Sequence, residues 1–171
     1  EWAKECYHLS YGMVDLPDGK MKSREGNVVD ADDLVNHMIK TAKSRTEELG
    51  KIDDFDPKDS VELYNKIALG ALKYYLLKVD PKKKMLFDPE ESIDFNGNTG
   101  PFIQYTYARI RSIIRRAESL NIKYDKFNFD QIKNISNGQK KIIDHIYQLP
   151  KIIKISSDSY SPSLISQFTY D

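Results

Sequence analysis

The sequence lacks several features that would assign it directly to a functional class: paired cysteines, a membrane span, a signal peptide and a metal-ligand cluster. Its 171 residues include one cysteine, Cys6, which excludes an internal disulfide and favours a reducing compartment. No apolar run is long enough to span a membrane, and the first residues, EWAKECYHLS, lack a signal-peptide pattern. His, Cys and Asp do not cluster at metal-ligand spacing. These absences predict a cytoplasmic protein that has no metal site of its own.

The formal net charge is zero, because 26 basic residues balance 26 acidic ones. The distribution is uneven, however. Residues 47–62 are strongly acidic, whereas residues 101–123 contain four arginines and a lysine against a single glutamate. A basic segment hidden in a neutral total favours an anionic partner for that segment.

Apolar residues recur at helical spacing and predict a mainly α fold. Helices are expected over residues 31–49, 59–79, 101–120 and 140–158, and another after Ser161. Asp30 and Ser161 are the expected N-caps, Gly50 is the expected stop, and Pro150 predicts a break or kink in the fourth helix. Residues 6–16 read as a strand and residues 80–100 as irregular.

Two of these helices have well-defined apolar stripes that we expect to be buried. The stripe of the helix over 59–79 comprises Val61, Tyr64, Ala68, Leu72, Tyr75 and Val79. The stripe of the helix over 101–120 comprises Ile103, Tyr107, Ile110, Ile114 and Ala117. Four arginines border this second stripe.

The segment GKMKSREG, residues 19–26, places lysines between two glycines. Lysines in a mobile loop suit phosphate, since an ammonium on a flexible stem can follow charge that moves during nucleotidyl transfer. Most lysine-rich turns are simply solvated, so composition alone favours that interpretation. A P-loop is excluded, because Val14 stands where its first glycine is needed and Met21 where Ser or Thr is needed.

Two long segments resemble one family. GKMKSREG is similar to the K-M-S-K-S signature loop of class I aminoacyl-tRNA synthetases, and HLSYGMVDLPDGKMKSREGNVVDADDL resembles its arginyl version. FDPEESIDFNGNTGPFIQYTYARIRSIIRRA resembles the entry to the anticodon-binding domain of the same family. The segments stand in the family's order, and the resemblance covers most of residues 8–117.

The resemblance implies roles for the loop residues. The ATP-binding loop would comprise Gly19, Lys20, Met21, Lys22, Ser23 and Arg24, with Lys20 as the catalytic lysine that stabilises pyrophosphate as arginine attacks ATP. Ser23 falls on the second signature lysine and cannot supply its charge. Adenine would be contacted from the preceding segment, at His8, Met13 and Val14, and Mg²⁺ would arrive with ATP.

The resemblance also implies a transfer-RNA surface on the basic helix. Its candidate residues are Gln104, Tyr105, Arg109, Arg111, Arg115 and Arg116. The alternative is that these arginines are solvated flanks whose stems pack on the apolar stripe. His37 and His145 fall on helices away from the loop and are interpreted as structural.

The chain is accordingly expected to be the C-terminal portion of an arginyl-tRNA synthetase and to be inactive alone. Residues 1–50 would end the catalytic domain as a short β/loop remnant, residues 51–95 would form a helical connecting region that contacts the tRNA stem, and residues 96–171 would begin an incomplete anticodon-binding bundle. An incomplete bundle would expose apolar surface around Ile110 and Ile146 and favour self-association. Two alternatives remain: a helical adaptor that binds RNA or protein, and a degenerate, non-catalytic synthetase relative.

Overall fold

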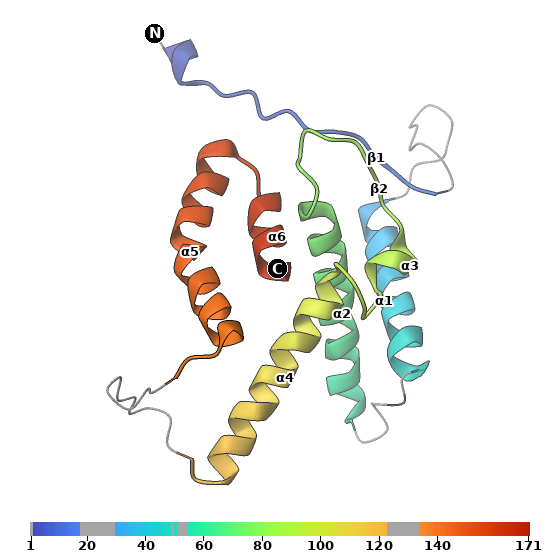
Figure 1. Ribbon diagram of the computed structural model, residues 1–171. Coiled ribbons are helices and arrows are strands. Elements are labelled where there is room, and N and C mark those ends of the chain that lie inside the picture. The colour runs from blue at the N-terminus through green and yellow to red at the C-terminus, as the bar shows by residue number, and fades with distance from the viewer. Residues whose placement is uncertain (1, 18–29, 49, 51–54, 123–133) are drawn as a thin grey trace.

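A computed structural model describes residues 2–17, 30–48, 50, 55–122 and 134–171. Within these ranges the chain is mainly helical, as expected (Figure 1). The helices are α1 (Ala31–Glu48), α2 (Pro57–Leu77), α3 (Pro89–Ser92), α4 (Gly100–Ser119), α5 (Asn137–Ser159) and α6 (Ser163–Tyr170), preceded by the 3₁₀ turn η1 (Trp2–Glu5). Two short strands are β1 (Val14–Asp15) and β2 (Met85–Leu86).

The main core lies between α1 and α2. Both helices begin where the sequence supplies a cap: Asp30 accepts from the backbone N–H of Asp32 at 2.9 Å, and Asp56 accepts from that of Lys58 at 2.9 Å. Gly50 has φ +61° and follows the end of α1, as expected. The fully buried side chains of this hydrophobic core include Met38 and Ala42 of α1, Ala68 and Ala71 of α2, and Phe87 and Ile93 from the β2–α3 region.

The predicted stripe of α2 is partly wrong. Tyr64, Ala68 and Tyr75 are buried, but Val61 is 58% exposed and Ile67 takes a buried place that the prediction omitted. Ile67 precedes Ala68 directly, so the buried face of α2 is wider than a single line of residues at a 3–4 spacing.

The expected strand over residues 6–16 is much shorter than predicted. Only Val14 and Asp15 are strand, and they pair in parallel with Met85 and Leu86. The preceding residues run as an extended segment with exposed side chains. The region over 80–100, expected to be irregular, supplies β2 and the short helix α3. A strand partner seventy-one residues away cannot be predicted from local sequence.

Helix α4 crosses α2 at close range near its N-terminus. A Cβ at Gly100 would lie 2.4 Å from the carbonyl oxygen of Gly70, so only glycine fits there. Thr99 is the N-cap, and its hydroxyl oxygen accepts from the N–H of Phe102 at 3.3 Å. The predicted stripe of α4 is largely not buried: Tyr107 is 64% and Ile110 51% exposed, because α4 leaves α2 after its first turns (Figure 1).

Helix α5 continues through Pro150, so of the break or kink predicted there the break is wrong. Ser161 is not the N-cap of α6. That place belongs to Pro162, and the Ser161 hydroxyl donates to Asp80 at 2.9 Å. His145 is structural, as expected: its ring stacks on Phe168 at 3.9 Å between centroids, with Nε2 2.8 Å from the Phe168 carbonyl oxygen. Helix α6 thereby lies between α5 and α2 (Figure 1).

Of the helices in the described residues, none is both long and apolar enough to cross a membrane.

Candidate functional site

The signature loop falls outside the described residues, and with it Gly19, Lys20, Met21, Lys22, Ser23 and Arg24. The framework on either side of it is described. β1 leads into the loop on one side, and α1 follows on the other, beginning at Ala31. The backbone N–H groups of Met85 and Phe87 donate to the carbonyls of Met13 and Asp15 at 3.0 and 2.8 Å, which fixes β1 against β2.

The residues expected near adenine differ in their surroundings. His8 and Met13 are exposed, and Val14 is half-buried. The Met13 carbonyl is already engaged by β2 and the N–H of Gly12 by the carbonyl of Pro81, at 2.6 Å. These two backbone groups therefore hold the strand in place.

A hollow of about 470 Å³ lies where the chain leaves β1. Its walls come from three elements: Leu16 and Pro17 after β1, Asp33, Leu34 and His37 of α1, and Asp88, Pro89 and Glu90 of α3. His37 thus lies beside the residues that lead into the signature loop, closer than its position on a helix suggested. The carboxylates of Asp33, Asp88 and Glu90 give the rim of this hollow a negative charge. The described residues contain no group of three or more acidic, His or Cys side chains able to hold a metal ion.

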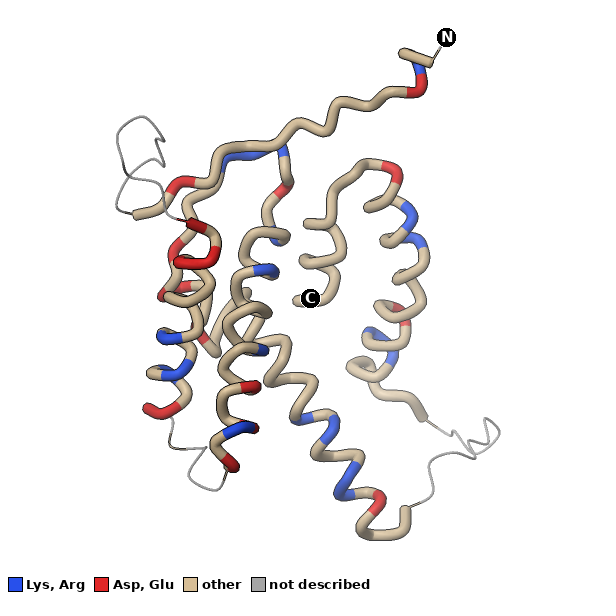
Figure 2. The backbone as a smooth tube through the Cα atoms, turned by 180° about the vertical axis from the view of Figure 1, so that it is seen from behind, with Lys and Arg blue, Asp and Glu red and all other residues tan. Residues whose placement is uncertain are grey.

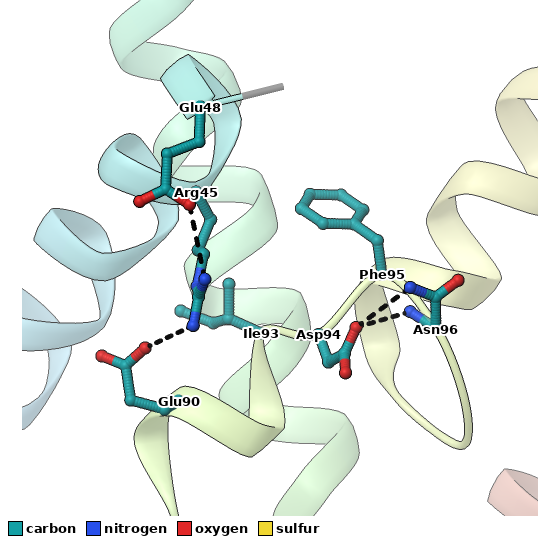
Figure 3. Close-up of a pocket in the computed structure, with 7 residues that line it drawn as sticks. All are labelled: Arg45, Glu48, Glu90, Ile93, Asp94, Phe95 and Asn96. Carbon is teal, nitrogen blue, oxygen red and sulfur yellow. Dashed lines mark hydrogen bonds and ion pairs between the residues drawn. The ribbon is translucent and has the colours of Figure 1, made fainter. Parts of the chain in front are cut away.

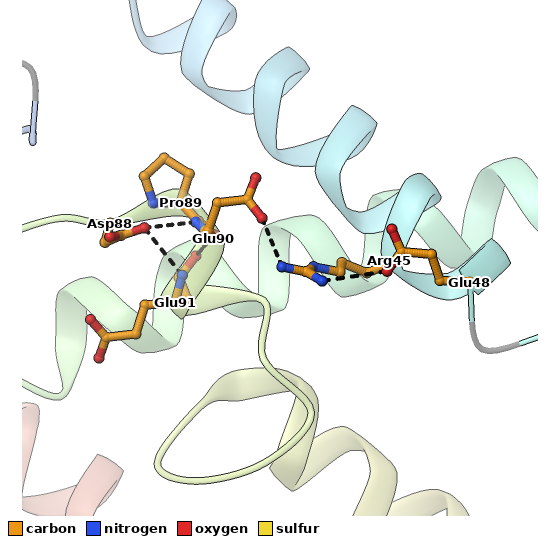
Figure 4. Close-up of polar contacts among 7 residues, drawn as sticks. Arg45, Glu48, Asp88, Pro89, Glu90 and Glu91 are labelled. Carbon is orange, nitrogen blue, oxygen red and sulfur yellow. Dashed lines mark hydrogen bonds and ion pairs between the residues drawn. The ribbon is translucent and has the colours of Figure 1, made fainter.

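An arginine joins α1 to α3 beside this hollow. Arg45 donates through Nη2 to Glu90 at 3.2 Å and through Nη1 to Glu48 at 3.4 Å (Figure 4). The charges of Glu48 and Glu90 raise the pKa of Arg45 above its usual range. Asp88 caps α3 by accepting from the N–H groups of Glu90 and Glu91. Sequence reasoning missed this contact, because Arg45 and Glu90 are forty-five residues apart.

The same arginine lines a second hollow, of about 230 Å³, with the turn that leads to α4. Figure 3 shows Arg45 and Glu90 on one side and Asp94, Phe95 and Asn96 on the other. Asp94 accepts from the backbone N–H of Asn96 at 2.8 Å, which closes the turn. The arginine is held between two carboxylates, so this hollow does not offer an unneutralised positive charge.

The basic residues of α4 remain on the surface. Arg109, Arg111, Arg115 and Arg116 are all exposed, and basic residues recur along the half of the helix that lies away from α2 (Figure 2). Helical spacing places Arg111 and Arg115 on one flank and Arg109 and Arg116 on the other, with Ala108 and Ser112 between them. The exposed apolar residues Tyr107 and Ile110 lie on the opposite side. A chain of phosphates could therefore follow the small residues between two rows of guanidinium groups.

Gln104 and Tyr105, at the start of this surface, make different contacts. The Gln104 amide donates through Nε2 to the Lys66 carbonyl at 2.9 Å, and a Cβ at Gly70 would lie 2.3 Å from that nitrogen. Gln104 therefore joins α4 to α2. Tyr105 is 44% exposed, with Arg109 5.8 Å from its ring centroid, and it lines a cavity of about 440 Å³ together with Phe55 and Phe95.

Residues 103–171 match the protein family described as the DALR anticodon binding domain. This match contains α5, α6 and nearly all of α4. The resemblance of residues 87–117 to the entry of an anticodon-binding domain is confirmed by this match, which begins at residue 103.

Over its whole length the chain is similar to proteins named arginine–tRNA ligase. It is 53% identical over 175 residues to one from Flavobacterium psychrophilum and 49% identical over 174 residues to one from Bacteroides thetaiotaomicron. Both comparisons cover 100% of this chain and 28% of the relative. The chain therefore spans between a quarter and a third of the length of these relatives, and the resemblance to arginyl-tRNA synthetases is confirmed along all of it.

The fold has a counterpart among solved structures. A Thermus thermophilus arginyl-tRNA synthetase superposes with a TM-score of 0.81 at 24% sequence identity, over 98% of this chain and 26% of that chain. The mainly helical fold expected from the sequence is thereby confirmed.

Proposed function

We propose that this chain is part of an arginine–tRNA ligase, a cytoplasmic enzyme that activates arginine with ATP and transfers it to tRNA(Arg). The observation that carries the proposal is the 53% identity to a protein of that name, which extends over the whole chain. Alone, the chain holds one part of such a site and is expected to be inactive.

Within that enzyme, residues 1–50 would end the catalytic domain, residues 51–95 would connect it, and residues 96–171 would belong to the anticodon-binding domain. Lys20 would supply positive charge where pyrophosphate charge develops, and Gly19, Met21, Lys22, Ser23 and Arg24 would complete the ATP-binding loop. Mg²⁺ would enter with ATP. His8, Met13 and Val14 would border adenine.

The transfer RNA would bind along α4. Arg109, Arg111, Arg115 and Arg116 would contact phosphates, and Tyr105 would offer a ring for stacking. Gln104 would act indirectly, by holding α4 against α2 through Lys66. All four arginines are exposed and therefore accessible to phosphates, and the RNA-binding test below decides between this assignment and the solvated-flank alternative.

The test is binding of this chain to a tRNA(Arg) transcript, measured by filter retention at several salt concentrations. We expect binding at low salt that weakens steeply as salt rises, because phosphate contacts release counterions. Absence of binding at low salt would contradict the RNA-binding role. A helical adaptor would also bind, so aminoacylation by a full-length protein containing this chain distinguishes the enzyme from the adaptor and from a degenerate relative.

A further inference from the structure

The turn between α5 and α6 contains a residue whose backbone conformation is unusual for its type. Tyr160 closes α5 with φ 53° and ψ 37°, the left-handed conformation. Its N–H donates to the carbonyl of Ser157 at 3.1 Å. Helices that end in this way generally place glycine or asparagine there, because a Cβ is disfavoured. A tyrosine at this position needs a reason in its side chain.

The side chain of Tyr160 contacts the N-terminal segment. Its ring stacks on that of Tyr7, with 4.4 Å between centroids and 21° between planes. Tyr7 belongs to the extended segment that runs through Gly12 into β1, after which the chain enters the signature loop. Both rings are about half exposed, so the pair lies on the surface and outside the core.

A second set of contacts ties the same turn to the same segment. The Ser161 hydroxyl donates to Asp80 at 2.9 Å, in the connection between α2 and β2. The next residue, Pro81, accepts from the N–H of Gly12 at 2.6 Å, and a Cβ at Gly12 would lie 1.9 Å from the Lys83 carbonyl oxygen. The α5–α6 turn therefore reaches the segment ahead of the loop both directly and through residues 80–83.

We propose that Tyr160 is a positioning residue of the ligase: its ring fixes the segment that carries the signature loop against the DALR domain. The inference rests on the proposed function and deepens it. Helix α4 contacts α6 through Phe102 and Tyr170, whose ring centroids are 5.8 Å apart, and α6 packs on α5. RNA bound on α4 could therefore displace the α5–α6 turn, and with it Tyr7 and the strand that leads to Lys20. Tyr160 itself touches neither ATP nor RNA in this arrangement.

Replacement by glycine separates positioning from stability. Tyr160→Gly removes the ring but suits the left-handed backbone, so the variant should fold at least as well as the parent chain. Tyr160→Phe keeps the aromatic ring and should therefore keep the aminoacylation activity of the parent. Tyr147→Ala is the matched control, because Tyr147 is also on α5 and is 85% exposed.

The functional readout is steady-state aminoacylation of tRNA(Arg) by a full-length protein that contains this chain. We expect Tyr160→Gly to lower kcat by about ten- to a hundredfold with the KM for arginine unchanged, since misplacing a catalytic group by about 1 Å costs on this scale. Tyr160→Phe and Tyr147→Ala should keep the parental kcat. An unchanged kcat in Tyr160→Gly, or an equal loss in Tyr147→Ala, would overturn the inference.

A structural readout on the 171-residue chain separates this inference from the proposed function. Hydrogen exchange of the amides of residues 8–13 should be faster in Tyr160→Gly than in Tyr160→Phe. Equal exchange in the two variants would overturn the positioning contact and leave the ligase proposal standing. A full-length parent that does not aminoacylate tRNA(Arg) would overturn both the ligase proposal and the role of Tyr160 in it.

Discussion

Gly70 of α2 and Gly100 of α4 bring the two helices into backbone contact. A Cβ on Gly100 would lie 2.4 Å from the Gly70 carbonyl oxygen and 2.8 Å from its carbonyl carbon. Backbone atoms cannot step aside as a flexible side chain can. The φ of Gly100 is not positive, so the contact with α2 is the reason for glycine at this position.

Gly100→Ala should therefore destabilise the chain. The new methyl group would push α4 away from α2 and strain the Gln104–Lys66 hydrogen bond. Overpacking of this kind usually lowers the free energy of unfolding by about 1–3 kcal/mol. Gly138→Ala is the matched control, because its new Cβ would meet only the Ser136 hydroxyl at 4.0 Å. That change should stabilise α5 by about 0.5–1 kcal/mol. Urea unfolding of both variants measures the difference; equal stabilities would contradict the close crossing.

The contrast between α2 and α4 shows what local sequence can predict. Periodicity located both helices to within about two residues, because each carries a cap, a proline in its first turn and a repeating apolar side. It could not tell that Tyr64 is buried while Tyr107 is exposed, since burial depends on which helix lies opposite. The apolar stripe of α4 meets no helix along most of its length in the described residues.

For the candidate site, too, the sequence predicted some features and missed others. Motifs predicted the signature loop, which lies outside the described residues, and the basic helix, most of which falls within the family match. They could not reveal that Arg45 pairs with Glu90, that Ser161 donates to Asp80, or that Tyr7 stacks on Tyr160, because each pair joins residues separated by at least forty-five positions. At Pro150 a local rule predicted a break or kink, and the helix continues through this residue without a break.

Two tyrosines give the chain a pH dependence in the alkaline range. Burial is the largest cause that raises the pKa of Tyr74 to about 12 and that of Tyr75 to about 12. Tyr75 also donates to Glu91 at 2.9 Å. Because their pKa is raised on folding from an ordinary value of 10.0, the stabilisation is complete below about pH 10 and is lost as the pH rises towards about 12.

We expect the free energy of unfolding to fall over this alkaline window, and to fall less steeply in Tyr74→Phe and Tyr75→Phe. Urea unfolding between pH 8 and 12, with the ultraviolet absorbance of tyrosinate recorded in parallel, measures both quantities. Tyr147→Phe, at an exposed position, is the control and should leave the slope unchanged. Titration of all tyrosines together near pH 10 would contradict the raised values.

The arginines of α4 should each contribute to the salt dependence of RNA binding. Arg111→Ala and Arg115→Ala should weaken binding to a tRNA(Arg) transcript and reduce the slope of log K against log salt by about 1 each. Lys43→Ala is the control: it removes one exposed positive charge from α1, where Lys43 pairs with Glu47 at 3.8 Å. An equal reduction in all three variants would mean that RNA responds to net charge and does not follow α4.

Lys20 should be needed for chemistry more than for binding. In a full-length protein containing this chain, Lys20→Ala should slow arginyl-adenylate formation by about 10²–10³ while arginine binding changes little, because its charge matters where pyrophosphate charge develops. Ser23→Ala should cost much less, since Ser23 has no charge to lose. Single-turnover assays measure both rates. Near-normal activation by Lys20→Ala would show that the loop has been aligned wrongly.

The last prediction concerns apolar surface on α4 and α5. Ile110 is 51% and Ile146 61% exposed, and Ile142, four residues before Ile146 on α5, is 62% exposed. Apolar side chains repeated along one side of a helix and left in water favour association with a like surface. We therefore expect the 171-residue chain to self-associate as its concentration rises, which sedimentation equilibrium would detect.

Ile146→Glu should shift the equilibrium towards the monomer by placing charge within this surface. Gln148→Glu adds the same charge to the same helix two residues away and should shift it much less. If both variants and the parent sediment as monomers at every concentration, these isoleucines are tolerated in water and the surface is not an interface. If both variants shift the equilibrium equally, the association responds to net charge alone, and apolar contact at Ile146 does not drive it.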